Sequence, residues 1–366
     1  MSSVNNKNLK NIRLTITENC NLDCIYCYEK NKTTNKMDYE TAKKIITAEL
    51  RHSPENVLNI EFFGGEPFLN FELIKDISKY IWTGEWRVKP NISICTNGTQ
   101  FSDEIKEWII ENNSRLEIGI SLDGDKETQD HNRHSSFNDI DYDFISTLSN
   151  ATIKMTITFD RIKHLAEDLI FLHKLRLPIG CNIDYDSPWP DNEEIIEIIS
   201  YQLAILEQYY LKNPDVRVCT ILDMPIQTII LKPVRHINKY CGAGNTIVTY
   251  SVDGQKYPCQ GFMPLSNKSM NLENISFPEL IPVDCFDSEC QSCIILNSCP
   301  NCYATNLIQR GSIYKKDLSK CKIIKLFYSA TAHLTYMKIM NNQDSKELQE
   351  KIRLLYCIKQ INDKLS

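Results

Sequence analysis

The chain of 366 residues is long enough for one large domain and a smaller second one, and its 42% hydrophobic and 24% charged residues are an ordinary globular balance. A net charge of −6 with scattered Lys and Arg residues argues against nucleic-acid binding, which needs a basic surface. No apolar run reaches the roughly 20 residues that span a bilayer, and the opening residues MSSVNNKNLKN lack the apolar core of a signal peptide. We therefore expect a cytoplasmic protein without membrane or nucleic-acid partners.

Strand-like and helix-like segments alternate along the first part of the chain. Short β-branched and apolar runs predict six strands, at Ile12–Thr17, Val57–Phe63, Asn91–Thr96, Leu116–Leu122, Ile153–Phe159 and Ile179–Tyr185. The stretches between them predict helices, at Tyr39–Arg51, Phe71–Trp82, Asp103–Asn112 and His164–Leu175. Six β–α repeats favour a parallel sheet with helices packed outside, and they are too few for an eight-fold barrel. The predicted fold is α/β, a partial (β/α)6 TIM-like barrel with a small Cys-rich C-terminal domain.

The pattern changes after the sixth predicted strand. Glu193–Leu211 has the spacing of an amphipathic helix, whereas Gly, Pro and Cys dominate from Tyr240 to Cys321, as expected where metal ligation replaces an apolar core. Two further helices, Lys322–Met340 and Ser345–Ile361, are expected to close the chain. We therefore predict four regions: the barrel over 1–187, a helical bridging region over 188–239, a Cys-rich domain over 240–330 and C-terminal helices over 331–366.

The chain contains fifteen cysteines, far more than is usual where thiols stay reduced, and such thiols generally bind metal or act in redox chemistry. They gather in two places. Cys20, Cys24 and Cys27 follow the first predicted strand, and eight more lie between Cys241 and Cys321, both included. This spacing predicts two metal regions at opposite ends of the chain.

Polar motifs follow the next three predicted strands at the point where each strand ends. They are Gly64-Gly65-Glu66-Pro67, Thr96-Asn97-Gly98 and Ser121-Leu122-Asp123-Gly124. Ligands of parallel α/β folds bind at the carboxyl ends of the strands, where these motifs and the first three cysteines would meet. Taken singly, each motif is as well explained by a tight turn or a helix cap.

Three thiolates within eight residues suit a [4Fe–4S] cluster, because they hold three of its four irons and leave the fourth open to a small chelating molecule. A zinc site completed by a distant fourth residue is the alternative. The spacing CxxxCxxC, with Tyr26 before its third cysteine, resembles the signature of the radical S-adenosylmethionine (SAM) superfamily. The resemblance implies that the open iron binds the amino and carboxylate groups of SAM.

The same resemblance implies roles for the strand-end motifs. The GGEP segment would meet the methionyl ammonium of SAM, a task suited to a carboxylate beside a glycine turn. Ser121 would contact the ribose, Tyr26 would lie near the adenine, and Arg133 would pair with the methionyl carboxylate. The implied SAM-binding residues are Tyr26, Gly64, Gly65, Glu66, Pro67, Asn97, Ser121 and Arg133, and the implied ligands of the first cluster are Cys20, Cys24 and Cys27.

The C-terminal cysteines resemble a SPASM domain, the auxiliary-cluster module of peptide- and protein-modifying radical SAM enzymes. The implied ligands, enough for one or two auxiliary [4Fe–4S] clusters, are Cys290, Cys293, Cys299 and Cys321 in one set and Cys241, Cys259 and Cys302 in the other. Two residues rather than the usual three separate Cys299 from Cys302, and the second set is one ligand short. Either the fourth iron of that cluster is open, or Cys285 or a non-Cys group is its ligand. A zinc ribbon is the alternative interpretation of this segment.

The implied reaction begins with reductive cleavage of SAM to a 5′-deoxyadenosyl radical, which takes hydrogen from the substrate. The leading hypothesis is maturation of a ribosomally made precursor peptide by an oxidative cross-link, through a C–C, thioether or ether bond. The alternatives are formylglycine formation as in anaerobic sulfatase maturases, peptide epimerisation, and a non-catalytic iron–sulfur electron-transfer or sensor protein. In the sulfatase maturases an Asp base follows the Gx4C cysteine, whereas here Gln260 stands there and cannot remove a proton at neutral pH.

Expected partners are the precursor peptide, a reductant such as flavodoxin or ferredoxin, and, as one option, a separate leader-binding protein. Only about ten residues precede the first predicted strand, too few for a leader-binding domain, so leader recognition is expected to use the 188–239 segment, the barrel rim or a separate protein. The general base is not assigned. Asp123, Asp184 and Asp186 lie at predicted strand ends and are candidates, although acids at such places often cap turns.

Overall fold

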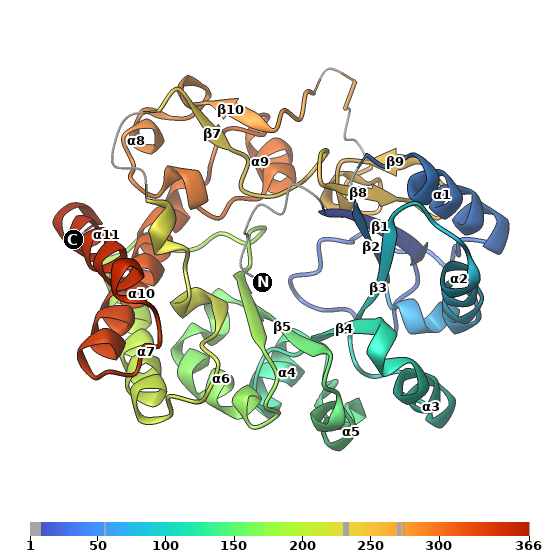
Figure 1. Cartoon of the computed structure of the whole chain (residues 1–366), viewed down its shortest axis with the longest axis horizontal. Coiled ribbons are helices and arrows are strands. Elements are labelled where there is room, and N and C mark those ends of the chain that lie inside the picture. Colours follow the sequence, from blue (N-terminus) through green and yellow to red (C-terminus); the bar gives the residue numbers. More distant parts are fainter. Residues whose placement is uncertain (1–8, 55, 230–233, 269–271, 274, 366) are drawn as a thin grey trace.

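The computed structural model describes residues 9–54, 56–229, 234–268, 272–273 and 275–365. Its centre is a curved sheet in which six strands lie parallel and side by side in sequence order (Figure 1). They are β1 (Leu9–Thr17), β2 (Val57–Gly64), β3 (Lys89–Thr96), β4 (Leu116–Ser121), β5 (Ala151–Ile157) and β6 (Ile179–Ile183). The predicted α/β fold, a partial (β/α)6 barrel, is confirmed and is called the half-barrel below. β1 begins three residues earlier than expected, and β5 and β6 each end two residues earlier.

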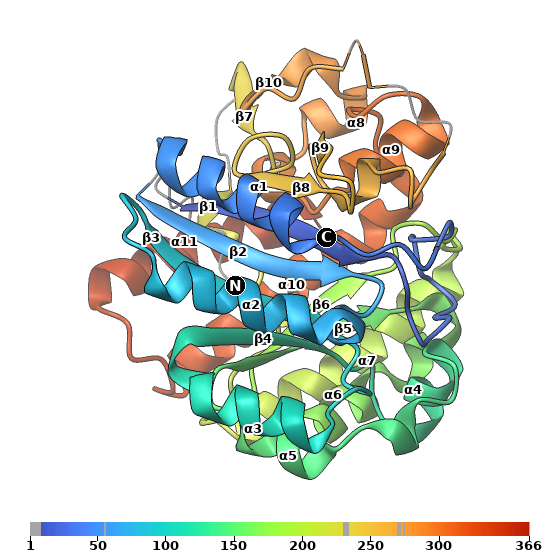
Figure 2. The ribbon, with the colours of Figure 1, turned by 90° about the vertical axis from the view of Figure 1, so that its right-hand side faces the viewer.

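Helices cover the outer face of this sheet, as Figures 1 and 2 show. They are α1 (Tyr39–His52), α2 (Phe71–Thr83), α3 (Asp103–Asn112), α4 (Lys126–Asn132), α5 (Tyr142–Thr147) and α6 (Leu165–His173). Side-chain caps set where they begin: the Asp38 carboxylate accepts from the Thr41 N–H at 2.8 Å, and Ser102 caps α3 in the same way. The four helices predicted for this part of the chain are confirmed.

The two faces of the sheet differ in character. On the outer face, side chains such as Ile12, Leu58 and Ile153 are buried against the helices and form the main core. The residues that alternate with them face the interior of the half-barrel. In a sheet covered by helices on both sides, this second face would also be apolar. Here the inner face is largely polar, with Arg13, Glu61, Ser93, Cys95, Ser121, Lys154 and Thr156. A polar interior of this kind suits ligand binding better than tight packing.

Two strands of the Cys-rich region extend the same sheet. β8 (Ile247–Tyr250) pairs parallel with β1, starting with Asn11 opposite Ile247, and β9 (Lys256–Tyr257) returns antiparallel beside it. The sequence pattern predicted no strand here, because a run of four residues between glycine-containing turns carries little periodicity. The Cys-rich region is therefore continuous with the barrel sheet.

The remaining elements close the molecule on the side of β6 and above the sheet (Figure 1). Helix α7 (Glu193–Lys212) packs on α10 (Cys321–Met340), which packs on α11 (Leu348–Leu365), so the three helices predicted there are confirmed. A small second core, which includes Phe262 and Ile281, holds the Cys-rich region together. Its elements are β7 (His236–Asn238), β10 (Leu280–Pro282), α8 (Ser288–Gln291) and α9 (Tyr303–Arg310). Among the helices described, none combines the length and apolarity needed to cross a membrane.

A buried histidine between α6 and α7 predicts a pH-dependent stability. The ring of His173 hydrogen-bonds the Tyr210 hydroxyl at 2.7 Å, and burial lowers the pKa of His173 to about 4. An unfolded histidine has a pKa of about 6.5, so the unfolded state binds more protons between these values. The stabilisation is complete above pH 6.5 or so and is lost as the pH falls toward 4, a difference on the order of 2–3 kcal/mol.

Denaturant unfolding of wild type and His173→Gln across pH 4 to about 7.5 checks this expectation. Gln retains a hydrogen-bonding side chain but does not titrate, so its stability should change less with pH. His52→Gln, at the exposed end of α1, is the matched control and should follow the wild type. Parallel curves for wild type and His173→Gln would contradict the assignment.

Candidate active site

Cys20, Cys24 and Cys27 lie on the loop that leads from β1 to α1, at the carboxyl edge of the sheet. All three are partly buried, and burial raises the pKa of Cys20 to about 11 and raises those of the other two thiols as well. Lys32 interacts electrostatically with all three thiols and donates to the Leu22 carbonyl at 2.9 Å. The loop thus gathers three thiols around one cation. The charge of this cation acts against the effect of burial, because it lowers the thiol pKa values and so favours the thiolate forms.

Two other strand-end segments hold this loop in place. The Asn97 amide, after β3, donates to Asn21 Oδ1 at 3.0 Å and lies 3.9 Å from Cys20 Sγ. The Ile25 N–H donates to the carbonyl of Asn132, at the end of α4, at 3.0 Å. The positions of the cysteines therefore depend on motifs that follow β3 and β4.

The Gly64-Gly65-Glu66-Pro67 segment turns tightly against the start of the same loop. Gly64 has a φ of +129°, and a Cβ there would lie 2.1 Å from the Thr17 carbonyl oxygen. A Cβ on Gly65 would lie 2.1 Å from the Asn19 carbonyl oxygen, so neither position tolerates a side chain. Pro67 begins a short 3-10 turn, a place where its missing N–H costs nothing.

Glu66 is fully buried and already has partners inside the protein. Its carboxylate accepts from the Asn97 N–H at 2.7 Å, the Thr96 hydroxyl at 2.8 Å and the Phe68 N–H at 3.1 Å. Burial raises the pKa of Glu66 to about 7. The residue therefore ties the end of β2 to the end of β3, and contact with an ammonium would be an additional interaction that favours its ionised form.

Asp123 is the centre of a polar network behind the cysteine loop. Its carboxylate accepts from Nε and Nη2 of Arg133 at 3.0 and 3.1 Å, from the Tyr26 hydroxyl at 2.5 Å and from the Thr156 N–H at 2.9 Å. The Arg133 guanidinium also lies 5.3 Å from the centroid of the Tyr26 ring. Arg133 and Tyr26, both predicted to face SAM, are thus held by one buried carboxylate.

The sequence suggested Asp123 only as a candidate base and did not reveal this anchoring role. A buried acid two residues beyond a strand, with an Arg ten residues later, is the signal that could have indicated it. Ser121 ends β4 and faces the interior, and within the described residues its hydroxyl has no hydrogen-bond partner. This hydroxyl is therefore available to a ligand.

The C-terminal cysteines separate into the two predicted sets. Four thiols line one cavity of about 260 Å³ together with Lys316: they are Cys290, Cys293, Cys299 and Cys321. Cys321 interacts electrostatically with the other three, and burial and these neighbours raise its pKa to about 12. Cys259 likewise interacts with Cys302 and Cys241, and burial raises the pKa of Cys259 to about 12. Cys285 is exposed, and its electrostatic neighbour is Tyr314.

Side chains of the barrel reach the second set. Arg13, on the inner face of β1, forms an ion pair with Glu61, donates to Gln260 Oε1 at 2.6 Å and interacts electrostatically with Cys259. Tyr185, just after β6, interacts electrostatically with cysteines of both sets. The Cys-rich region is therefore adjacent to the barrel interior.

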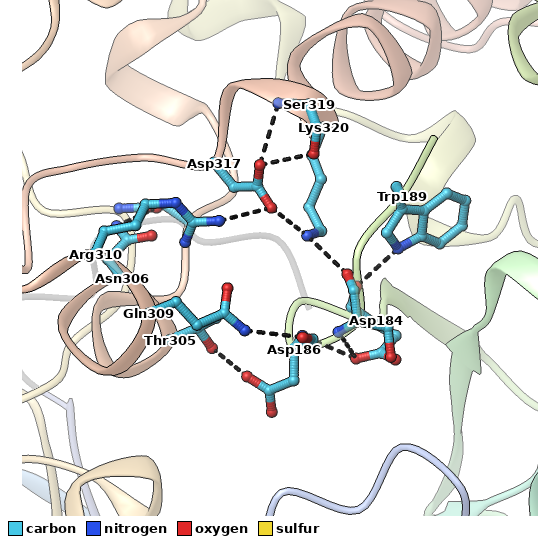
Figure 3. Close-up of polar contacts among 12 residues, drawn as sticks. Asp184, Asp186, Trp189, Thr305, Asn306, Gln309, Arg310, Asp317, Ser319 and Lys320 are labelled. Carbon is cyan, nitrogen blue, oxygen red and sulfur yellow. Dashed lines mark hydrogen bonds and ion pairs between the residues drawn. The ribbon is translucent and has the colours of Figure 1, made fainter. Parts of the chain in front are cut away.

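Asp184 and Asp186, the other candidate bases, have structural roles. Asp184 Oδ1 accepts from the N–H groups of Asp186 and Ser187 at 2.9 and 3.3 Å, which caps the turn that ends β6. Asp186 accepts from the Thr305 hydroxyl at 2.7 Å, and the Gln309 amide donates to its carbonyl at 2.8 Å (Figure 3). These bonds attach α9 to the end of β6.

A second contact of the same kind involves a buried lysine. Lys320 is only 2% exposed, donates to the Ser187 carbonyl at 3.1 Å and pairs with Asp317 at 2.5 Å (Figure 3). Arg310 pairs with the same carboxylate at 2.8 Å. Because Cys321 follows Lys320 directly, this network fixes one cysteine of the first C-terminal set relative to the barrel.

In the described ranges, no three or more His, Cys, Asp or Glu side chains lie close enough to hold a single metal ion. The thiols of a four-iron cluster bind different irons, so they lie farther apart than the ligands of one ion. Sets of three or four soft thiolates have the donor chemistry of iron–sulfur sites, and no imidazole lines the cavity of the four C-terminal thiols. The residues present fit that class of cofactor.

A parallel half-barrel with three cysteines on its first strand-end loop defines the class of protein. Residues 14–158 match the family model of the Radical SAM superfamily, so this part of the chain is a radical SAM domain. A radical SAM domain implies a SAM-binding [4Fe–4S] cluster and SAM as cofactors.

Sequence relatives match between about a third and nearly nine tenths of the chain. An uncharacterized protein of Methanocaldococcus jannaschii is 40% identical over 116 residues, which are 32% of this chain and 39% of that protein. A GTP 3′,8-cyclase of Clostridium botulinum is 32% identical over 122 residues, 32% of this chain and 35% of the cyclase. The radical SAM cyclopropyl synthase TigE of Paramaledivibacter caminithermalis is 22% identical over 351 residues, 87% of this chain and 73% of TigE. The chain spans less than half of the length of the first curated relatives.

Solved structures share the fold over nearly the whole chain. The structure of anSMEcpe with bound AdoMet and Cp18Cys peptide superimposes with a TM-score of 0.69 at 17% identity, over 92% of this chain and 98% of that one. Streptococcus suis SuiB bound to its precursor peptide SuiA superimposes with a TM-score of 0.54 at 14% identity, over 84% of this chain and 75% of SuiB. At these identities the likeness concerns the fold.

Proposed function

We propose that this protein is a radical SAM enzyme that modifies a ribosomally made precursor peptide by an oxidative cross-link. The observation that carries the proposal is the placement of two cysteine-rich regions around one polar half-barrel interior, with Arg13 joining that interior to Gln260 and Cys259. The peptides bound by anSMEcpe and SuiB, which share the fold, support a peptide as substrate.

For the first cofactor, we propose that Cys20, Cys24 and Cys27 hold the [4Fe–4S] cluster and that the strand-end motifs hold SAM. Bound there, cluster and SAM would supply a 5′-deoxyadenosyl radical able to take an unactivated hydrogen. The chain's own part is to position the partners. Asp123 fixes Tyr26 and Arg133, and the glycine turn at 64–65 allows close backbone approach. Ser121 offers a hydroxyl that has no partner among the described residues.

For the C-terminal region, we propose a SPASM domain with up to two auxiliary [4Fe–4S] clusters. Cys290, Cys293, Cys299 and Cys321 would hold one of them, which the common cavity of these four thiols supports. Cys241, Cys259 and Cys302 would hold the other with one iron left to a further ligand. Such clusters can accept the electron that an oxidative cross-link releases, and Tyr185 lies beside cysteines of both sets.

Gln260 favours cross-linking over formylglycine formation. It occupies the place of the base in sulfatase maturases, and its amide oxygen accepts from Arg13 at 2.6 Å, so it is held as a neutral acceptor. A reductant such as flavodoxin or ferredoxin, a separate leader-binding protein and a cytoplasmic location complete the proposal.

The proposal is tested by anoxic co-expression with candidate short peptides from neighbouring genes, followed by mass spectrometry. Loss of two hydrogens, abolished in Cys24→Ala, is the expected result, and fragmentation locates the new bond. An unchanged mass that rises by one unit in deuterated water would mean epimerisation. No change in either solvent would contradict the peptide proposal and return attention to a protein substrate. Absence of any SAM cleavage would favour the electron-transfer or sensor alternative.

A further inference from the structure

Lys154 extends across the inner face of the half-barrel. It lies on β5, in register with Ser121 of β4, and is half-buried. A Cβ built on Gly119 would lie 3.1 Å from Cε and 3.5 Å from Cγ of Lys154, so the lysine stem crosses β4 where the glycine leaves room. The ammonium reaches far enough to interact electrostatically with the thiol of Cys95 on β3. Its charge is therefore near the middle of the interior.

The charge of Lys154 lacks the compensation that neighbouring cations have. Arg13 pairs with Glu61, and Arg133 pairs with Asp123. For Lys154, the part of the chain that the structure describes contains no hydrogen-bond or ion-pair partner. Partly burying an unpaired ammonium costs free energy, which an anionic ligand in the interior would recover.

The ammonium of Lys154 lies farther inside the barrel than the predicted SAM site. The strand-end motifs lie at the carboxyl edge of the sheet, where Asn97 follows β3 and Ser121 ends β4. The stem of Lys154 turns away from that edge: it passes Gly119, whose register partner is Cys95, and both lie two residues before the motif residues of their own strands. A ligand that contacts this ammonium thus extends below the edge, into the barrel.

We propose that Lys154 binds a carboxylate of the substrate and so selects peptides with an acidic group close to the residue that is modified. This inference rests on the proposed peptide-modifying function. The carboxylate belongs either to an Asp or Glu side chain or to the peptide C-terminus, since both present the same two oxygens to an ammonium. Lys154 acts here as a specificity residue, whereas the SAM-binding residues at the edge do not distinguish substrates.

The first test compares Lys154→Met with wild type on the co-expressed peptide and on its synthetic counterpart. Loss of a charge-assisted hydrogen bond is expected to lower kcat/KM for the peptide by roughly 10- to 100-fold. The dissociation constant of SAM, measured by equilibrium dialysis without peptide, is expected to stay unchanged and also reports correct folding. Lys79→Met, on the exposed side of α2, is the matched control and should resemble wild type in both assays.

Changes in the peptide identify the carboxylate. Neutralising each acidic residue in turn to Asn or Gln, and amidating the C-terminus in a further peptide, should reproduce the loss at one position only. For that peptide, kcat/KM should be equally low with wild type and with Lys154→Met. A Lys substitution at the same position should be processed better by Lys154→Glu than by wild type.

Three results would overturn the inference. One is equal processing of acidic and fully neutralised peptides by wild type. The second is weaker SAM binding by Lys154→Met, which would assign the ammonium to the carboxylate of SAM. The third is failure of wild type to modify any peptide, which would remove the proposed function as well. The first two leave the proposed function standing.

Discussion

Replacing Asp123 by Asn is expected to lower the free energy of unfolding by about 3–5 kcal/mol. The change removes the negative charge that two nitrogens of Arg133 face at 3.0 and 3.1 Å, while only 6% of Arg133 is exposed to solvent. A buried guanidinium without its counter-ion is far more costly than a lost surface pair. Urea unfolding under anoxic conditions, followed by circular dichroism, measures the difference.

The matched control is Asp160→Asn. Asp160 lies 3.7 Å from His131 in a pair whose two side chains are 45% and 61% exposed, so a change within about 0.5 kcal/mol is expected. Removing both charges in Asp123→Asn with Arg133→Met should recover part of the stability, because no uncompensated cation remains. A loss below about 1 kcal/mol in Asp123→Asn would contradict the idea of a buried, essential pair.

The Asp123 network also connects stability to ligand binding. The same carboxylate receives the Tyr26 hydroxyl at 2.5 Å, and Tyr26 lies between Cys24 and Cys27 on the cysteine loop. Weaker SAM binding in Asp123→Asn is therefore expected even at temperatures where the variant stays folded. A variant that is destabilised but binds SAM normally would restrict Asp123 to a purely structural role.

Replacing Cys24 by Ala is expected to remove one cluster, about four irons per chain, and to reduce SAM cleavage to the detection limit. Only two thiolates would remain on the loop, too few to hold a cluster that needs three. The C-terminal cysteines belong to a different part of the fold, so their iron should remain. Iron and sulfide analysis and the yield of 5′-deoxyadenosine measure both effects.

Two further variants make this expectation specific. Cys357→Ala, a buried cysteine of α11 in apolar surroundings, should keep full iron content and SAM cleavage. Cys299→Ala should lose C-terminal iron but still cleave SAM, since Cys299 shares its cavity with three other C-terminal cysteines. Undiminished SAM cleavage in Cys24→Ala would refute the assignment of the first cluster.

The periodicity of apolar residues, together with the turn and cap residues between segments, was sufficient to predict most of the fold. Alternating strands such as Val57–Gly64 and capped helices such as Asp103–Asn112 are local features, and most bounds were located within about two residues of the observed ones. The start of β1 and both ends of α11 were missed by three or four residues. The register of β8 beside β1 was not predictable, because four residues carry too little pattern and the pairing joins segments more than two hundred residues apart.

In the candidate site, too, some features were predictable from the sequence and others only from the structure. CxxxCxxC, GGEP and the C-terminal cysteine spacings are compact motifs, so the sequence by itself indicated a radical SAM domain, a parallel sheet and two cysteine-rich regions. Only the tertiary structure decided which charges meet: Arg133 with Asp123, Arg13 with Glu61 and Gln260, and Lys154 with no counter-ion among the described residues. The physical reason is that the partner of a charged side chain leaves no local pattern in the sequence. The packing of distant strands decides which charges meet.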